Sequence, residues 1–238
     1  MRKFAMRFHP PLIPATLLRR RKRFLADVRF ADGSEVTVFC PNTGRMIGCA
    51  DAGSEVWLST HDSPTRKYRH CWEISTAPQA LVGVNPSRAN GFVRDAIEAG
   101  LILPLQGYAT CRGEVRYGEN SRIDWLLESP DRPPCYVEVK SVTAADEYGI
   151  GFFPDAVSER GAKHMRELST IAASGARAVV IFCVQRGDAL AVRAADEIDP
   201  AYGRAMRAAL HAGVEVYAYR ADVSPQGIAL TRRIPVLP

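Results

Sequence analysis

The alternation of apolar and polar residues predicts two regions of different architecture. Up to Asn85, apolar residues recur at every second position in short runs, at 24–30, 34–40, 55–60, 70–76 and 79–85. The first two runs flank "ADG", a turn signal that predicts a β-hairpin. Short strands spaced in this way are typical of a small closed barrel. The five-stranded OB-fold is a common barrel of this kind among nucleic-acid-binding proteins.

After Asn85 the pattern changes between helical and strand periods. It predicts helices at 89–99, 157–173 and 200–212, and strands at 107–116, 121–128, 135–142, 177–184, 214–220 and 228–234. This order predicts a mixed α/β sheet covered by helices on both faces. We therefore expect an α+β chain of two domains, an OB-like barrel at 1–85 and an α/β domain at 86–238.

The positive charge is concentrated in the predicted barrel region. Residues 1–80 contain 13 basic and 7 acidic side chains, whereas the remaining residues contain 18 basic and 19 acidic ones. A polyanion such as DNA would be attracted to the N-terminal part, with an affinity that depends on salt and not on sequence.

Two basic segments of this region are candidates for contact with DNA. Residues 63–72, "SPTRKYRHCW", place Arg66, Lys67 and Arg69 beside Tyr68 and Trp72. Cations and aromatic rings together offer phosphate partners and stacking faces for bases. A solvated loop with aromatic residues in the core is an equal alternative. The basic run 19–23 has the same two interpretations, a solvated face or a polyanion contact.

Other features narrow the classes of protein. The six cysteines are scattered without a C-x-x-C pair, which disfavours a zinc site and favours reduced thiols. The longest strongly apolar run, 178–184, suits a buried strand and is too short to span a membrane. We expect a cytoplasmic protein with no membrane contact, and the sequence carries no signal for its oligomeric state.

The segment 121–141, "SRIDWLLESPDRPPCYVEVKS", reads as a hairpin with charges on one face. Glu138 and Lys140 are two residues apart and share that face, and Asp124 can reach it from the other arm. Two close carboxylates repel each other unless a cation lies between them or one is protonated. Mg²⁺ or Mn²⁺ would resolve this conflict, and Lys140 would then face a phosphate held at the metal. A solvent-facing hairpin with mutually paired charges is the alternative.

The helix that follows adds cations near this hairpin. Its apolar stripe leaves Arg160, Lys163 and His164 on the other side, together with Glu167. A cationic helix face beside an acidic metal site would suit a phosphate substrate, although an ordinary exposed face gives the same pattern. No Cys or His stands at ligand spacing from His164, so we interpret it as a phosphate or structural contact.

Five segments together resemble the sugar fermentation stimulation protein A (SfsA) family: "CPNTGRM", "GVNPSRAN", "EVRYGENSRIDWLL", "YVEVKSVT" and "FFPDAVSERGAKHMREL". The resemblance implies DNA binding and an OB-like N-terminal domain, followed by a domain that resembles the PD-(D/E)xK nuclease superfamily. It makes Asp124 the metal-binding Asp, Glu138 the second acid and Lys140 the catalytic Lys.

The resemblance implies further site residues. The superfamily often adds an upstream Glu as a metal ligand. Glu98 and Glu114 both qualify, and strand alternation favours Glu114. The first segment adds DNA contacts at 42–45, namely Asn42, Thr43 and Arg45. One position departs from the pattern, because Pro86 stands where many relatives have Thr.

Two functions therefore follow from the sequence. The first is a Mg²⁺- or Mn²⁺-dependent DNA endonuclease delivered to its substrate by a basic barrel. The second is a non-catalytic DNA-binding regulator of sugar (maltose) metabolism genes, in which the nuclease-like domain is only a scaffold.

Overall fold

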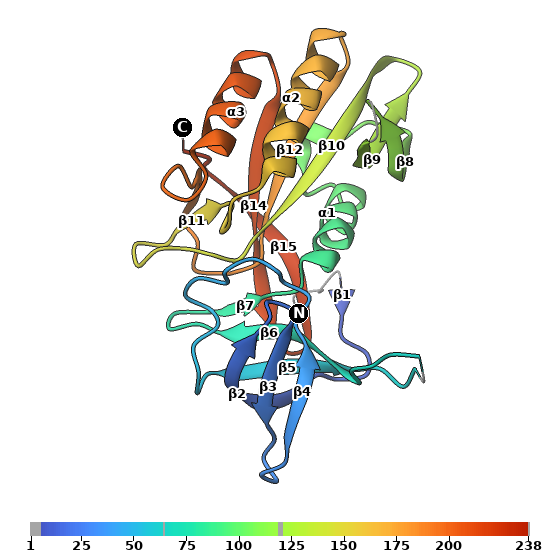
Figure 1. Ribbon diagram of the computed structural model, residues 1–238. Helices are drawn as coiled ribbons and strands as arrows, with labels where there is room; N and C mark the ends of the chain where they lie inside the picture. The colour runs from blue at the N-terminus through green and yellow to red at the C-terminus, as the bar shows by residue number, and fades with distance from the viewer. Residues whose placement is uncertain (1–5, 64, 119–120, 238) are drawn as a thin grey trace.

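The structure is a computed structural model that describes residues 6–63, 65–118 and 121–237. It contains a six-stranded sheet, a seven-stranded sheet and a two-stranded sheet. Figure 1 shows the six-stranded sheet as a barrel below, and the seven-stranded sheet with its helices above. None of the helices in these residues is long and apolar enough to cross a membrane.

The N-terminal part is a closed five-stranded barrel. Its strands are β2 (Ile13–Arg21), β3 (Leu25–Arg29), β4 (Glu35–Phe39), β5 (Glu55–Thr60) and β6 (His70–Thr76). They pair in the order β4-β3-β2-β5-β6, and the pair Phe39 and Cys71 closes the ring between β4 and β6. The short strand β7 (Leu81–Gly83) pairs with β6 outside this ring. The predicted barrel is therefore present.

The prediction of which strands form the barrel was wrong in one place. The run 79–85 was expected to be the fifth strand, but β2 takes that place. Ala15 and Leu17 of β2 point into the core, whereas Thr16 between them is exposed, so the strand alternates as a half-buried strand should. Pro14 and the arginines at 19–21 hide that alternation in the sequence.

The C-terminal part is the expected mixed sheet with helices on both faces. Its strands are β8 (Thr110–Tyr117), β9 (Ser121–Ser129), β10 (Arg132–Val142), β12 (Arg177–Val184), β14 (Glu215–Ser224) and β15 (Gly227–Ile234), joined by β1 (Met6–Arg7). The order is β1-β15-β14-β12-β10-β9-β8, with β10, β12 and β14 parallel. The helices are α1 (Ala89–Glu98), α2 (Glu159–Ala173) and α3 (Pro200–His211), with short 3₁₀ turns at Pro86–Arg88 and Leu103–Leu105.

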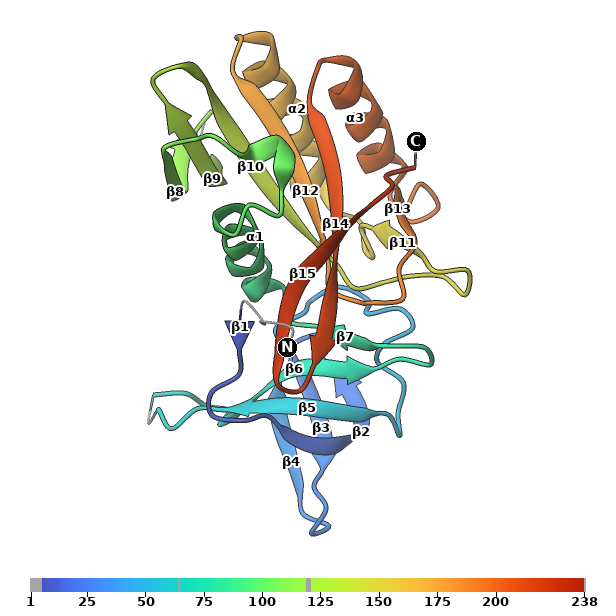
Figure 2. The same ribbon diagram turned by 180° about the vertical axis from the view of Figure 1, so that it is seen from behind.

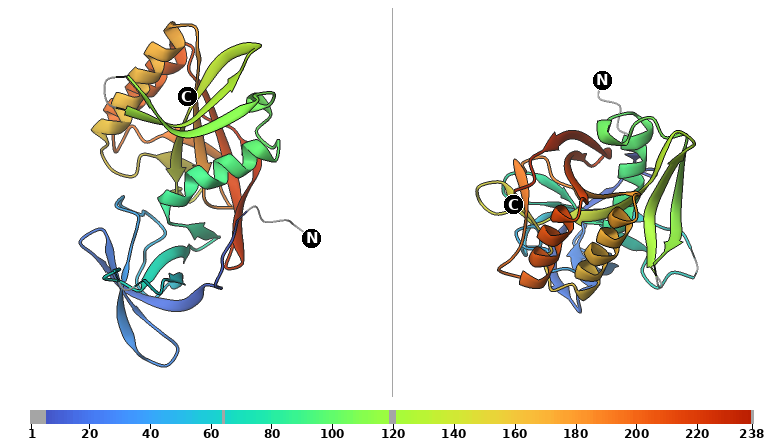
Figure 3. Two further views of the ribbon diagram at one scale, coloured as in Figure 1. Left: turned by 90° about the vertical axis from the view of Figure 1, so that its right-hand side faces the viewer. Right: turned by 90° about the horizontal axis from the view of Figure 1, so that it is seen from above.

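The two faces of this sheet have separate cores. Val137 and Val139 of β10 pack on the side of α1, in one apolar cluster with Phe92. The register places Glu138 beside Val180, which packs with Met165 of α2 in the other cluster. Figure 3 shows α1 on the opposite side of the sheet from α2 and α3. Glu138 therefore points toward α2.

Besides β2, three further strands were not predicted. The pair β11 (Ile150–Phe153) and β13 (Ala191–Ala194) forms the two-stranded sheet, and each has only four residues. Strand β1 pairs with β15, although the two strands lie near opposite ends of the sequence. The division of the chain into 1–85 and 86–238 stays a prediction, and β1 makes contacts across it.

The barrel and the sheet are joined by apolar and polar contacts. The β14–β15 hairpin reaches down to β6 and β7 (Figure 2), where Ile228 and Ile74 belong to one core. The Gly83 amide donates to the Gln185 carbonyl at 2.8 Å. These contacts fix the barrel beside the start of α1.

Candidate functional site

Asp124 interrupts the pairing between β9 and β10. The antiparallel register reaches the pair Trp125 and Val137 and ends there. The Val139 amide donates instead to Asp124 Oδ2 at 2.6 Å. Asn90 Nδ2 of α1 donates to Asp124 Oδ1 at 2.7 Å. The carboxylate thus takes the place of a backbone acceptor and is held from both sides.

The surroundings of Asp124 disfavour its charge. Burial raises its pKa, and the negative charge of Glu138 raises it further. The hydrogen bonds from Val139 and Asn90 act in the opposite direction without cancelling the shift. The site therefore holds a carboxylate that a nearby cation would stabilise.

Glu138 is the most deeply buried acid of this site, with 3% of its surface exposed. Its Oε1 accepts from Lys140 Nζ at 2.6 Å and lies against His164 Nδ1 of α2. Burial acts to raise the pKa of Glu138, but the contacts with His164 and Lys140 outweigh burial, and the pKa lies below its ordinary value. Glu138 is therefore held as an anion.

The second carboxylate oxygen of Glu138 is left free. Glu138 Oε2 is buried and has no hydrogen-bond partner among the described residues. A buried acceptor without a partner costs free energy unless a water or an ion fills the place. With Asp124 beside it, this oxygen fits one ligand of a divalent cation, and Mg²⁺ is commonly bound by one or two carboxylates with water and phosphate oxygens.

The expected third acid does not reach this pair. Glu114 is exposed and makes no hydrogen bond or ion pair with any described residue. Its backbone is left-handed, with φ of 55°, and the strand changes face there: Cys111 packs in one core and Val115 in the other. The other candidate, Glu98, is exposed and paired with Arg94 at 2.7 Å. No group of three His, Cys, Asp or Glu side chains in the described chain could hold a metal.

Helix α2 presents fewer free cations than its sequence suggests. His164 was expected on a cationic outer face, but it is only 5% exposed, because it packs against Glu138. Arg160 Nε donates to His164 Nε2 at 3.3 Å, so Nδ1 carries the proton toward Glu138. Lys163 is half-exposed and lies 3.5 Å from Glu167. Arg160 and Lys163 remain at the surface beside the site.

The candidate DNA-binding loop of the barrel is only partly as expected. Arg66, Lys67 and Arg69 are exposed, and Lys67 lies over the Tyr68 ring at 5.7 Å from its centroid. Of the two interpretations of Trp72, the core position is the one observed: it is fully buried in the barrel core, and its indole donates to the Ile74 carbonyl. Arg69 is paired with Asp62 at 2.9 Å. The loop therefore offers two cations that pair with no described acid, Arg66 and Lys67, together with the ring of Tyr68.

The segment 40–46 docks on the other half of the molecule. The Met46 amide donates to Asp155 Oδ2 at 2.9 Å. A Cβ at Gly44 would collide with the same carboxylate, so only glycine fits there. Asn42 is buried, and its Oδ1 accepts from the Gly44 amide at 2.9 Å. Asn42 thus shapes the loop, whereas Thr43 and Arg45 are exposed and free to meet a ligand.

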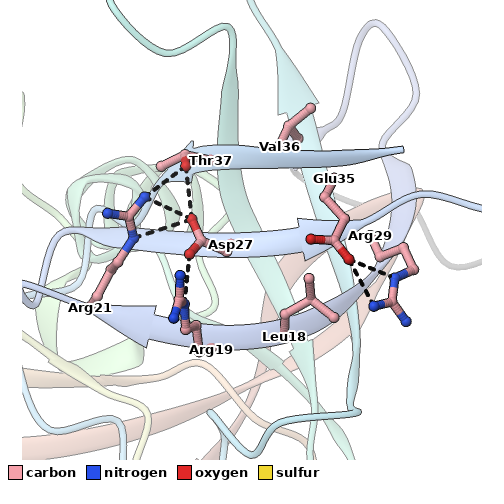
Figure 4. Close-up of a pocket in the computed structure, with 8 residues that line it drawn as sticks. All are labelled: Leu18, Arg19, Arg21, Asp27, Arg29, Glu35, Val36 and Thr37. Carbon is pink, nitrogen blue, oxygen red and sulfur yellow. Dashed lines mark hydrogen bonds and ion pairs between the residues drawn. The ribbon is translucent and has the colours of Figure 1, made fainter. Parts of the chain in front are cut away.

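The arginines at 19–21 of the basic run point to two sides of β2 and make different contacts. Arg19 and Arg21 lie on the outer face of the barrel and both hold Asp27 of β3, in an open pocket of about 610 Å³ (Figure 4). Arg20 points to the other side and donates to the carbonyls of Asn42 and Arg45. Paired arginines on this face have less charge to offer a polyanion than the run suggests.

Asn90 is a site residue that the sequence analysis missed. It lies in the first turn of α1, and its amide is bonded to Asp124. The same residue accepts from Trp125 Nε1 through its carbonyl, at 3.1 Å. The segment "GVNPSRAN" contained it, but an Asn near the start of a helix is ordinary in sequence.

Comparisons with known proteins agree with this architecture. The family model described as SfsA N-terminal OB domain matches residues 18–84, and the model described as Sugar fermentation stimulation protein RE domain matches residues 87–227. A sugar fermentation stimulation protein homolog of Thioalkalivibrio sulfidiphilus is 54% identical over 232 residues, which are 97% of this chain and 98% of that protein. The homolog of Geobacter sulfurreducens is 53% identical over 227 residues, 95% of this chain and 97% of the relative.

A solved structure is similar over the whole chain. It is described as Pyrococcus furiosus SfsA in complex with Ca²⁺, and it superimposes with a TM-score of 0.88 at 27% identity, covering 99% of this chain and 100% of that one. The barrel is therefore an OB domain, and the chain belongs to the sugar fermentation stimulation protein family.

Proposed function

We propose that this protein binds DNA through its barrel and hydrolyses phosphodiester bonds at a divalent metal held by Asp124 and Glu138. The observation that carries the proposal is the free, buried Oε2 of Glu138 beside a second carboxylate. Such an oxygen needs a cation or a water, and a cation also relieves the repulsion between the two acids.

The ligands limit the class of metal that the site would bind. Carboxylate oxygens are hard ligands that suit Mg²⁺, Mn²⁺ and Ca²⁺. The Ca²⁺ in the similar Pyrococcus furiosus structure supports a divalent ion in this family. A bound Mg²⁺ or Mn²⁺ would polarise a phosphoryl oxygen and lower the pKa of a bound water.

Lys140 is the group that meets the substrate charge. Its ammonium is only 11% exposed and is held at 2.6 Å by Glu138 Oε1. A phosphate at the two carboxylates would lie within reach of this ammonium, which shares their face. Its charge would stabilise the negative charge that develops as the phosphodiester bond breaks. Arg160, exposed next to His164, would contact a neighbouring phosphate.

The barrel lies where it can guide a strand to this site. Arg66 of the basic loop lines a pocket of about 470 Å³, whose other wall contains Ser87 and Gly91 at the start of α1. Asn90, in the same turn of α1, holds Asp124. A strand on Arg66 and its neighbours would thus pass along α1 toward the carboxylates. A DNA substrate would also place the activity in the cytoplasm.

The test is a cleavage assay with Mg²⁺ or Mn²⁺ on plasmid, single-stranded and branched DNA. We expect metal-dependent cleavage by the wild type. Lys140→Ala should lower the rate by about 100- to 1000-fold, the usual effect of removing one group that stabilises the transition state. DNA affinity should be largely kept, because most of it would come from the barrel.

The control is Arg204→Ala, which removes an exposed cation from α3 and leaves the carboxylates and the cations of α2 unchanged. Cleavage that survives in Lys140→Ala would assign the activity to another site or to a contaminant. No cleavage by the wild type on any of the three substrates would refute hydrolysis.

DNA binding is tested separately in the basic loop. Neutralising Arg66, Lys67 and Arg69 together should weaken binding to unrelated sequences alike. It should also flatten the dependence of affinity on salt, by up to about 0.9 in logarithmic slope for each lost phosphate contact. Fluorescence anisotropy at several salt concentrations measures both effects.

The matched control removes three cations from β13 and α3, namely Arg193, Arg204 and Arg207. Two of these pair with acids, Arg193 with Glu197 and Arg207 with Asp196. If this variant loses as much affinity as the loop variant, only net charge matters and the loop is not the binding surface.

The second candidate function is regulation of sugar metabolism genes by DNA binding alone. The names of the curated relatives, sugar fermentation stimulation protein homologs, favour it. A regulator would bind DNA without cleaving it, and its affinity would not depend on Lys140. Specific affinity for one promoter sequence, with no cleavage under any metal, would decide for this alternative.

A further inference from the structure

A second pocket, of about 360 Å³, opens on α2 next to the carboxylate site. Tyr117, at the end of β8, forms one wall, and Lys163, Arg166, Glu167 and Ile171 of α2 form the other. Glu167 follows His164 by three residues, so the two side chains lie on one helix face, about 4.5 Å apart along the axis. The pocket is therefore a direct neighbour of the site that holds Glu138.

The lining combines an apolar interior with a cationic rim. The Tyr117 ring is buried in the core with Leu168, and Ile171 packs against that core. Lys163 is half-exposed, and the exposed Arg166 side chain has no hydrogen bond or ion pair to a described residue. A pocket of this size with few polar groups in an apolar lining is typical of a small-ligand site.

The Tyr117 hydroxyl is a buried polar group without a partner. Tyr117 is 8% exposed, and its hydroxyl makes no hydrogen bond to any described residue. Burial raises the pKa of Tyr117, and the nearby charges of Glu138 and Glu167 raise it further, so the hydroxyl stays protonated. A buried hydroxyl normally finds a partner. Glu167 lies close enough to act on the pKa of this hydroxyl but makes no normal hydrogen bond with it, so one ligand in the pocket would bond both groups.

Glu167 offers a hydrogen-bond acceptor on the same side. Its Oε2 accepts from Ser121 Oγ at 2.6 Å, which fixes the carboxylate. Its Oε1 lies 3.5 Å from Lys163 Nζ, a loose contact that leaves the oxygen able to accept another hydrogen bond. Gly118 lies next to this oxygen and adopts a φ of 54°, a left-handed backbone that favours glycine.

We propose that this pocket binds one unpaired nucleobase, with its phosphate, from the nucleic-acid strand whose neighbouring phosphate lies at Asp124 and Glu138. The base would rest against Ile171 and the small exposed part of Tyr117, where burial of its apolar surface stabilises it. An amino or imino group on its pairing edge would donate to Glu167, and a ring nitrogen or carbonyl would bond the Tyr117 hydroxyl. Lys163 and Arg166 would hold the phosphate.

This inference rests on the proposed function and makes it more specific. A base can enter the pocket only when it is out of the stack, which costs least where the strand is single, mismatched or damaged. The protein should therefore prefer DNA with at least one unpaired nucleotide. Free nucleotides share the chemistry of base and phosphate, so they are the other source of a ligand to examine.

The test is a binding measurement in EDTA, which removes divalent ions and so prevents the proposed cleavage. Two duplexes are compared, one with a single unpaired base and one with an abasic residue at the same position. We expect about tenfold tighter binding of the first, from burial of the apolar surface of one base. Tyr117→Phe and Glu167→Gln should each reduce this preference severalfold. Tyr117→Phe should not lower the free energy of unfolding, because its hydroxyl bonds no described residue.

The matched control is Tyr202→Phe. Tyr202 also has a buried hydroxyl without a partner in the described chain, but it lies on α3 and outside this pocket. It should keep the full preference for the unpaired base. A third variant, Arg166→Ala, should weaken both duplexes equally, because it removes a phosphate contact.

Several outcomes overturn the inference. Equal affinity for the two duplexes would leave DNA binding intact but refute the base pocket. A preference that persists in both Tyr117→Phe and Glu167→Gln would place the base elsewhere. Binding of adenosine or cytidine monophosphate that depends on Tyr117, without any preference between the duplexes, would assign the pocket to a free nucleotide. No binding of either duplex would refute the proposed DNA binding as well.

Discussion

Glu73 in the barrel and Glu138 in the helix-covered sheet are both buried glutamates, with 1% and 3% of their surfaces exposed. Both lie on strands, and both are paired with a cation. They differ in the hydrogen bonds that their carboxylate oxygens accept. That difference separates a structural carboxylate from one that can take a ligand.

Both oxygens of Glu73 are fully bonded. Oε1 accepts from Ser59 Oγ at 2.7 Å and from Arg88 Nη2 at 2.6 Å. Oε2 accepts from Asn85 Nδ2 at 2.9 Å and from Arg88 Nε at 2.6 Å. Arg88 lies at the entrance to α1, so this carboxylate ties the barrel to the sheet domain. No bonding capacity is left for a metal or a substrate.

Glu138 has the opposite distribution. Lys140 and His164 both contact Oε1, whereas Oε2 has no partner among the described residues. A fold selected for stability alone would place a donor against that oxygen, as it does in Glu73. An unfilled acceptor beside a second acid fits the proposed divalent ion, which would bond both carboxylates. Bonding, and not burial, distinguishes the two glutamates.

The largest expected effect on stability is at Glu73. Glu73→Gln removes the charge opposite Arg88 and places an amide donor among donors. We expect the free energy of unfolding to fall by roughly 3 kcal/mol, the low end of the usual cost of breaking a buried ion pair. The low end applies because the Arg88 side chain is 29% exposed. Urea unfolding measures the change in the free energy of unfolding.

The matched control for this prediction is Glu35→Gln. Glu35 also pairs with an arginine, Arg29, but both side chains are about half-exposed. Such pairs are worth less than about 1 kcal/mol. If the two variants lose equal stability, Glu73 is not the structural clamp described above.

Asp124 should tolerate the loss of its charge better than Glu73. Its pKa is raised by burial and by Glu138, so at neutral pH its charge costs stability, and Asp124→Asn removes that cost. The same change places an amide donor against Asn90 Nδ2 or the Val139 amide, both of which donate to this carboxylate. These effects offset each other in part, so we expect a smaller loss than the roughly 3 kcal/mol at Glu73.

The metal response of Asp124→Asn is the second readout. Mn²⁺ or Ca²⁺ should raise the melting temperature of the wild type, because it binds the folded state only, and should leave the variant unchanged. Differential scanning fluorimetry with and without the ion measures both effects. A loss of stability as large as that of Glu73→Gln, or a variant that still responds to the ion, contradicts the assignment.

The sequence was sufficient for the parts that depend on local periodicity. Glu138 and Lys140 stand two residues apart on one strand, and any regular strand brings them to one face. The hairpin of 24–30 and 34–40 was likewise found from its alternation and its turn, and it corresponds to β3 and β4. These features need no information from distant residues.

The parts that were missed depend on contacts between distant residues or on a single backbone angle. Strand β2 is stabilised by pairing with β3 and β5, which overrides its proline and its run of arginines. Glu114 leaves the site because one left-handed residue turns the strand over. His164 looks like a surface residue until α2 is packed on β10, where it meets Glu138. None of these follows from local spacing.

The smallest expected effect tests the paired arginines of the barrel face in Figure 4. Hydrogen bonds from Arg19 and then Thr37 lower the pKa of Asp27 to about 2, against an ordinary value of 3.8. Because the folded pKa is the lower one, the stabilisation is complete above pH 3.8 and is lost as the pH falls toward 2. Urea unfolding at several pH values should show a steeper acid loss for the wild type than for Asp27→Asn. Identical slopes would mean that these pairs are open in solution, which would return Arg19 and Arg21 to the set of cations available to DNA.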